Sequence, residues 1–348
     1  MLPTARVLTN SLGATGYPMY GTVMWTLIAL FPTNYWLVVL GRTFGWVAVT
    51  MCGGTGLVSV ALSDLVSGSE LAQANATFFA VIGMGVMAGQ LIGDNILIFL
   101  GQPRYVFAAR AVSAAIHLVF NYFYFPETLA VENRKPFNGP VNPLKCFSVL
   151  NMGTPMRKIV GMAMGQYCTE GKHIMGFRNL WLTSAVGMSM RSWSNFAMAY
   201  SCCMIAGGQV AALLIKWIGR RGYTTLSNLT NLLGYACWSQ PKLLPMWLGL
   251  AILLPGINAV GTSASKAMAV DLASAQGIGK GEFMSYFGNM RAITVIVAPL
   301  AYNALYDFSR RASNSAPIGT TWYLVALVGG LIPELLHRSM STGEMIVA

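Results

Sequence analysis

Long apolar segments separated by short polar stretches restrict most strongly how this chain can fold. A bilayer-spanning helix needs about 20 mostly apolar residues, and about ten segments of the chain meet that requirement. They are 11–31, 36–62, 76–100, 104–125, 156–177, 192–218, 223–240, 244–268, 283–306 and 319–337. Backbone polar groups in lipid must be hydrogen-bonded within the protein, and the alternating pattern of barrel strands is not visible. The sequence therefore predicts an all-α integral membrane protein.

The amount and placement of charge support this prediction. Charged residues make up 9% of the chain, against about 25% in soluble globular proteins. The net charge is +11, but the basic residues are spread over the loops, as orientation signals are, and form no single nucleic-acid-binding stripe. We therefore expect a lipid bilayer and no nucleic acid as partner. The six cysteines form no C-x-x-C pair and no zinc spacing, so we expect no metal and no cofactor.

The polar segment 126–155 divides the chain, with four apolar segments before it and six after it. Lys and Arg are more frequent in the loops on the same side of the membrane as this segment. Such an excess marks the cytoplasmic side, which places both termini and the segment in the cytoplasm. The predicted organisation is an N-terminal half, 1–125, a cytoplasmic central loop, 126–155, and a C-terminal half, 156–348.

An internal repeat relates the two halves. Asp64-Leu65 and Asp271-Leu272 follow comparable apolar segments, and two further apolar segments complete each half after them. Parallel repeats joined by a long central loop are a transporter architecture. If the halves match, the first half should contain six helices, so we expect two more to be encoded before Met1.

Several short motifs occur in a fixed order along the chain. They are Gly41-Arg42, Asp64-Leu65, Pro126-Glu127-Thr128-Leu129, Pro136-Phe137, Asn142-Pro143-Leu144 and Gly219-Arg220-Arg221. In order and spacing the chain resembles the major facilitator superfamily, and within it the tetracycline-efflux type of drug–proton antiporter. The resemblance implies a bundle of two parallel-repeat halves, of which this chain supplies helices three to twelve of twelve.

The resemblance also assigns roles to individual residues. It implies that Arg42 takes part in proton coupling. It implies conformational-switch loops at Asp64, Gly219, Arg220, Arg221 and Asp271. The transported partner would be a small molecule, with protons as the coupling ion, and the protein is expected to be a monomer.

The helix-five antiporter motif of that family, Gly-x-x-x-Gly-Pro-x-x-Gly-Gly, is altered at 85–94. Gln90 replaces the proline and Asp94 replaces the last glycine. The two lie four residues apart and share a helix face, which must point into the bundle or a wet cavity. Substrate or proton handling and a structural ion pair are both compatible with this face. The recurring Gly85, Gly89 and Gly93 predict close packing of this helix on a neighbour.

Charged side chains within apolar segments are functional candidates, because burying a charge in lipid is costly. They are Arg42, Asp94, Arg110, Glu170, Lys172, Lys266 and Arg291. Arg291 lies about 12 Å into its segment, at about 1.5 Å per residue, and should need a carboxylate, carbonyl or substrate partner. Arg42 and Lys266 lie nearer helix ends, from which a long side chain can extend to the interface.

Glu170 and His173 are three residues apart in a weakly apolar segment. A carboxylate beside a group that titrates near neutrality is compatible with proton relay. The alternative is a helix that ends early and leaves both residues in a wet loop. The candidate substrate or proton pathway consists of Arg42, Gln90, Asp94, Arg110, Glu170, His173 and Arg291.

These features favour a secondary transporter that moves a small solute by alternating access, with proton-coupled efflux implied by the resemblance. A membrane enzyme is disfavoured, because the three histidines are well separated and no nucleophile elbow is present. A transporter-like sensor or scaffold without transport stays open because the antiporter motif is altered. Basic groups outnumber acidic ones among the intramembrane charges, which indicates an anionic solute. The efflux resemblance implies amphipathic compounds instead.

Overall fold

The computed structural model describes residues 19–41, 54–124, 143–240, 242–257, 260–311 and 319–340, and these contain helices and no strand. The first helical pieces are Met19–Leu30 and 35–41. The longer elements are α3 (Gly54–Leu65), α4 (Gly68–Leu100), α5 (Pro103–Tyr124), η2 (Pro143–Asn151), α6 (Thr154–Cys168), α7 (Gly171–Ser184), α8 (Met190–Trp238), α9 (Leu243–Leu253), η3 (Leu254–Gly256), α10 (Thr262–Ala275), α11 (Lys280–Arg311), α12 (Thr320–Ala326), η5 (Leu327–Leu331) and α13 (Ile332–Arg338).

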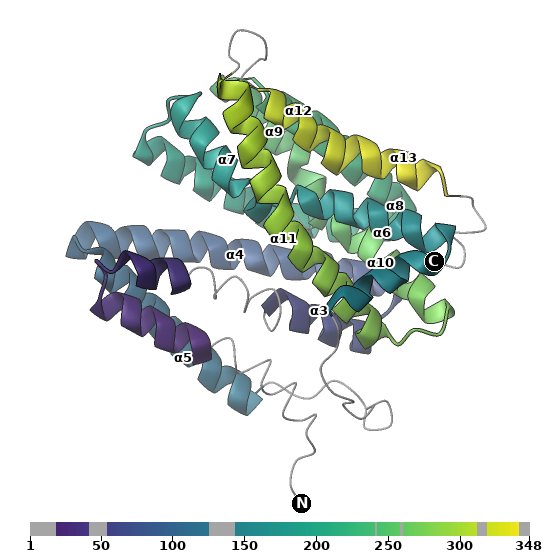
Figure 1. Ribbon diagram of the computed structural model, residues 1–348, viewed down its shortest axis with the longest axis horizontal. Helices are drawn as coiled ribbons and strands as arrows, with labels where there is room; N and C mark the ends of the chain where they lie inside the picture. Colours follow the sequence, from purple (N-terminus) through teal and green to yellow (C-terminus); the bar gives the residue numbers. More distant parts are fainter. Residues whose placement is uncertain are drawn as a thin grey trace, which may run out of the picture.

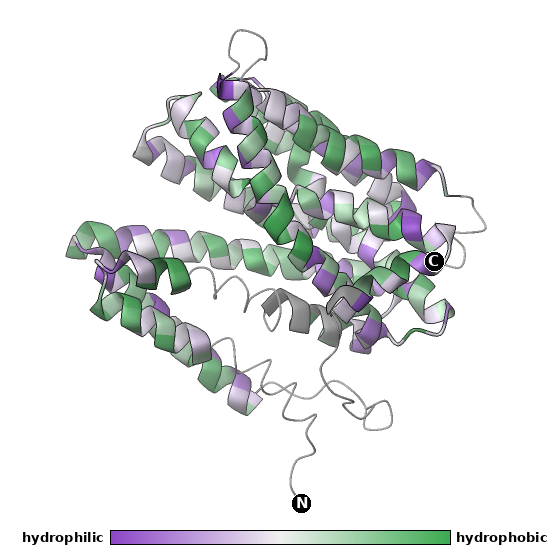
Figure 2. Cartoon of the chain, in the orientation of Figure 1, coloured by the Kyte–Doolittle hydropathy of each residue, from purple (hydrophilic) through white to green (hydrophobic). Residues whose placement is uncertain are grey.

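The helices form two groups that meet along α4. In Figure 1, α3 and α5 lie below α4, while α6 to α9, α12 and α13 lie above it. Hydrophobic residues predominate along α4 (Figure 2). Within the described part of the chain, α4, α5, α11 and residues Arg191–Trp238 are long and apolar enough to cross a membrane. The prediction of an all-helical membrane protein is confirmed.

Three predicted segments are not continuous α-helices. Segment 156–177 is divided between α6 and α7, and segment 244–268 between α9, η3 and α10. Segment 319–337 contains the π-helical turn η5 between α12 and α13. Polar residues and Gly or Pro lie at the first two breaks, namely Thr169-Glu170-Gly171 and Pro255-Gly256. Averaging over about 20 residues conceals such breaks, and irregular backbone at membrane depth is found where protein or a wet cavity surrounds it.

Helix α8 contains two predicted segments, 192–218 and 223–240, joined with almost no loop. Gly219 has φ 72° and ψ 171°, which is not helical and divides α8 into two sections. A positive φ is accessible to glycine without the steric cost that a Cβ atom imposes. The predicted boundary near Gly219 is therefore present as a kink of a single residue.

Close packing between α4 and α8 depends on small residues, but not on the predicted stripe. A Cβ atom added at Gly85 or Gly89 would meet nothing within 4 Å. The buried face of α4 ends at Gly83, where an added Cβ would lie 2.9 Å from Met204 Cβ in α8. The prediction of packing is wrong for Gly85 and Gly89, whereas a Cβ atom added at Gly93 would lie in ordinary contact with Val106 Cγ1 of α5, at 3.8 Å.

Substitution of Gly208 by alanine is expected to destabilise this crossing. The added Cβ would lie 2.6 Å from Ala80 Cβ and 2.7 Å from the backbone oxygen of Ala76, so the helices would have to separate. Overpacking of this kind costs about 1–3 kcal/mol. Thermal unfolding in detergent should show a lower melting temperature. Gly85→Ala, in open space on α4, is the control and should melt at or above the unchanged protein; equal melting of the two variants would contradict the packing.

Part of the predicted central loop is folded against the C-terminal helices. Cys146 and Val149 in η2 are fully buried, and Lys145 Nζ lies 6.0 Å from the centre of the Tyr286 ring in α11. Arg157 Nε donates to the Leu150 backbone oxygen. Burial raises the pKa of the Cys146 thiol, which keeps it uncharged. Residues 143–151 are thus a packed 3-10 helix, whereas 125–142 lie outside the described residues.

Candidate functional site

The break between α6 and α7 is held by side chains that bond to its backbone. His173 Nδ1 donates to the Tyr167 carbonyl oxygen at 2.6 Å, since a carbonyl only accepts. Tyr235 OH donates to the Thr169 carbonyl oxygen at 2.9 Å. These bonds satisfy carbonyls that a helix end would otherwise leave without partners. Glu170 and His173 are buried, with 3% and 1% exposed, so the wet-loop alternative is wrong.

Glu170 at this break forms an ion pair with Arg291 of α11. The distance from Arg291 Nη2 to Glu170 Oε2 is 2.8 Å, and the side chains are 15% and 4% exposed. The prediction that Arg291 needs a partner in the bundle is confirmed, and the partner is a carboxylate. The guanidinium carbon of Arg291 also lies 4.9 Å from the centre of the Tyr167 ring. Cation–π attraction of this kind strengthens as water is removed from the site.

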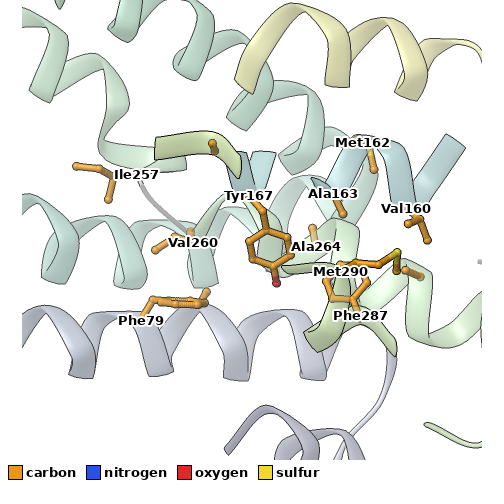
Figure 3. Close-up of a cluster of buried hydrophobic side chains, with 14 of the residues drawn as sticks. Phe79, Val160, Met162, Ala163, Tyr167, Ile257, Val260, Ala264, Phe287 and Met290 are labelled. Carbon is orange, nitrogen blue, oxygen red and sulfur yellow. The ribbon is translucent and has the colours of Figure 1, made fainter. Parts of the chain in front are cut away.

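Aromatic and aliphatic side chains surround the pair. Tyr167 projects from α6 toward α4 between Phe79 on one side and Phe287 and Met290 on the other (Figure 3). The Tyr167 and Phe287 rings are edge to face, with centroids 5.4 Å apart. The buried ion pair therefore lies beside an apolar cluster, in which charge interactions are stronger than in water.

Lys266 adds a second cation near the pair. It is 6% exposed, and its Nζ donates to Asn75 Oδ1 of α4 at 3.4 Å. Among the described residues, no carboxylate lies within 4.0 Å of its ammonium group. The expectation that Lys266 extends to the interface is wrong, because residues 262–270 around it are all buried.

The other predicted pathway residues lie elsewhere. Asp94 Oδ2 accepts from Ser194 Oγ of α8 at 2.8 Å, and Gln90 is half-buried on the same helix. The Arg110 guanidinium carbon lies 4.0 Å from the centre of the Trp25 ring. Arg42 is outside the described residues, as is the side chain of Lys172. Thus the structure joins Glu170 to Arg291, and it gives Asp94 and Arg110 different partners.

Two residues of the predicted switch loops in the second half, Arg220 and Asp271, lie in helices α8 and α10 rather than in loops, and they form an ion pair. Arg220 Nη1 lies 2.5 Å from Asp271 Oδ2, and the side chains are 25% and 20% exposed. Arg220 directly follows the kink at Gly219, while Arg221 is exposed. Asp64, its counterpart in the first half, is partly buried near the end of α3. The pair connects the kink in α8 to α10, the helix that also carries Lys266.

A buried polar chain that sequence reasoning missed extends from α10 to α13. Ser265 Oγ donates to Gln166 Oε1 at 2.7 Å, and Gln166 Nε2 donates to Asn228 Oδ1 at 2.7 Å. Asn228 Nδ2 then donates to Glu334 Oε2 at 3.1 Å, and Glu334 Oε1 accepts from Arg338 Nε at 2.8 Å. Glu334 lies inside the apolar segment 319–337 and is 5% exposed. A carboxylate inside an apolar segment was the sequence signal that could have identified Glu334 as a candidate.

These helices define a multi-pass membrane protein whose two groups of helices meet beside a buried ion pair. No protein-family model matches the sequence. Among solved structures, the human organic anion transporter MFSD10 (TETRAN) matches with a TM-score of 0.69 and 17% identity, over 94% of this chain and 80% of that chain.

Two further transporters have the same fold. The major facilitator superfamily proton:xylose symporter XylE matches with a TM-score of 0.61 and 10% identity, over 96% of this chain and 83% of that chain. A bacterial homologue of the iron transporter ferroportin, in an outward-facing state, matches with a TM-score of 0.57 and 13% identity, over 95% and 87% of the respective chains. The chain has the fold of major facilitator superfamily transporters, and these structural neighbours are transporters rather than enzymes.

Proposed function

We propose that this protein is a secondary transporter that carries a small organic anion between the two sides of a membrane by alternating access. The observation that carries the proposal is the balance of buried charge near the α6–α7 break. Arg291 is neutralised by Glu170 at 2.8 Å, whereas the hydrogen-bond partner of Lys266 among the described residues is the neutral Asn75 amide. An anion would compensate that remaining charge, since buried charges need partners.

The place of these residues in the fold supports the same proposal. Lys266 in α10 bonds to Asn75 in α4, so the cluster lies where the two groups of helices meet. Transporter sites lie at such interfaces, near discontinuous helices whose free backbone ends face the ligand. The neighbour MFSD10 is described as an organic anion transporter, which supports this substrate class.

The ion pair also suggests a means of proton coupling. Protonation of Glu170 would remove its charge and leave Arg291 free to bind the acidic group of a substrate. A proton and an anion would then bind together, which gives cotransport. The tetracycline-efflux resemblance implies the opposite coupling, in which a proton and a substrate exchange. The expectations of efflux and of a monomeric carrier belong to this resemblance.

Transport by the purified full chain in proteoliposomes tests the proposal. Benzenesulfonate is a suitable probe because its charge is fixed and it crosses lipid poorly, and phenyltrimethylammonium is a cation of similar size. We expect saturable uptake of benzenesulfonate and none of the cation. Uptake driven by an inward proton gradient would support cotransport, and uptake driven by an outward gradient would support exchange. Folded protein that moves neither probe would favour a sensor or scaffold instead.

A further inference from the structure

A further buried cation, besides Arg291 and Lys266, lies in α7. Arg178 follows Glu170 by eight residues, which is about 12 Å along a helix. It is 8% exposed, and its guanidinium carbon lies 4.7 Å from the centre of the Tyr200 ring in α8. In contrast to Arg291, Arg220 and Arg338, it has no carboxylate within 4.0 Å among the residues that the structure describes. Its charge is therefore not neutralised by an acidic side chain in the described part of the chain.

Two nitrogen atoms of the Arg178 guanidinium group have no acceptor in the described part of the chain. Nε and Nη1 are fully buried, and neither has a hydrogen-bond acceptor among the described residues. The contact with Tyr200 is a cation–π contact with the ring, which offers Nε and Nη1 no oxygen acceptor. The Tyr200 ring thus stabilises the charge of Arg178, while Nε and Nη1 have no hydrogen-bond acceptor among the described residues.

Two tryptophans in α7 and α12 also have indole N–H groups without an acceptor among the described residues. Trp181 lies three residues after Arg178, on the same face of α7. The indole Nε1 atoms of Trp181 and Trp322 are buried and have no acceptor in the described structure, and the rings are 5.5 Å apart. The Trp322 ring also stacks on the ring of Tyr235, with centroids 6.1 Å apart. We call Arg178, Trp181 and Trp322 the donor cluster.

An anion is the ligand that such a set of groups favours. Indole and guanidinium groups only donate hydrogen bonds, so water or a neighbouring amide satisfies them less well than a charged acceptor does. Buried donors without acceptors are rare in native proteins and call for an explanation. The Tyr200 ring supplies apolar surface beside the charge, which suits a ligand with an aromatic body.

We propose that the donor cluster is a binding subsite for the sulfonate or carboxylate group of an aromatic organic anion, separate from the Glu170–Arg291 pair. Its role in transport rests on the proposed function, and its role in binding does not. Because Glu170 is the N-cap of α7 and Arg178 lies within that helix, an anion would have two cationic binding positions, about two turns of helix apart. Arg178 would hold the anion at one binding position, while Arg291 and Lys266 would hold it at the other.

Equilibrium binding of benzenesulfonate to the purified full chain in detergent tests the subsite. Arg178→Gln should weaken binding at least tenfold, and Arg178→Lys should weaken it less, because charge is kept but the planar donors are lost. Trp181→Phe, which keeps an aromatic ring and removes the indole N–H, should also weaken binding. Arg104→Gln changes an exposed arginine and is the matched control; it should bind as the unchanged protein does.

Several results would overturn the subsite. They are unchanged affinity in both Arg178→Lys and Trp181→Phe, equal binding of phenyltrimethylammonium, and no binding by the unchanged protein at millimolar probe. If Arg178→Gln does not fold, the other two variants decide, since both preserve most of the packing. Binding without transport in proteoliposomes would reject the proposed function and leave the subsite intact. Transport by the unchanged protein, together with unchanged affinity in the variants, would support the proposed function and reject the subsite.

Discussion

Arg291→Ala is expected to lose both folded protein and transport. Removal of the guanidinium leaves Glu170, 4% exposed, without its partner at 2.8 Å. Breaking a buried ion pair by removing one member costs about 3–5 kcal/mol, which is a large share of the stability of a typical domain. Thermal unfolding in detergent should show the loss. Arg310→Ala, an exposed arginine near the end of the same helix, is the control and should change stability little.

A double variant separates the structural role of the pair from its role in transport. Arg291→Met combined with Glu170→Gln removes both charges and keeps similar volumes, so most of the lost stability should return. Transport of benzenesulfonate should stay absent, because Arg291, which is proposed to hold the anion together with Lys266, is still missing. A double variant no more stable than Arg291→Ala would contradict the energetic role of the pair. Normal transport by the double variant would remove Arg291 from the substrate site.

Asp271→Asn is expected to slow transport with little effect on folding. Its pair with Arg220 is about one-fifth to one-quarter exposed, so solvent screening reduces its contribution to about 1 kcal/mol. If the pair forms in only one of the two transport states, its loss shifts their balance about fivefold. Flux in proteoliposomes should fall on that scale, while the melting temperature stays nearly unchanged.

The reversed pair and a neighbouring arginine provide the controls for Asp271. Arg220→Asp combined with Asp271→Arg restores opposite charges and should recover part of the flux. Arg221→Gln changes the exposed residue beside Arg220 and should transport normally. An equal loss of flux in Arg221→Gln would indicate a general effect of charge at this end of α8. Unchanged flux in Asp271→Asn would reject the switch role.

Sequence reasoning succeeded where a property depends on local composition. Low charge and long apolar segments predict the helices α4, α5 and α11, because lipid permits little else. The depth of Arg291 in its segment predicts a partner, because a deep guanidinium cannot reach water. The identity of that partner was not predictable from spacing. Glu170 is 121 residues away in the chain, and only the packing of α7 on α11 brings the two together.

The predictions that failed concern short helix breaks and contacts between helices that are distant in the sequence. Hydropathy averaged over a whole span does not detect the three polar and glycine residues that break the helix between α6 and α7. The glycine spacing at 85–93 is suitable for packing, but which glycine contacts α8 depends on where the helices cross. Lys266 was expected to reach the interface, and Arg178 lay just beyond the predicted segment 156–177. Both are buried because helices distant in sequence cover them.

The single-residue kink in α8 limits how its two sections can move. A residue has only two soft backbone dihedral angles, and Gly219 is the one non-helical residue between residues 190 and 238. If both sections stay helical, their relative motion reduces to rotation about two bonds, with no spare chain to absorb a mismatch. Tyr200, whose ring contacts Arg178, lies in the first section of α8, and Asn228 lies in the second. Because no loop joins the two sections, a movement of the first must be transmitted to the second as a rotation. The orientation of one section of α8 relative to the other is thus set by two angles, φ and ψ of Gly219.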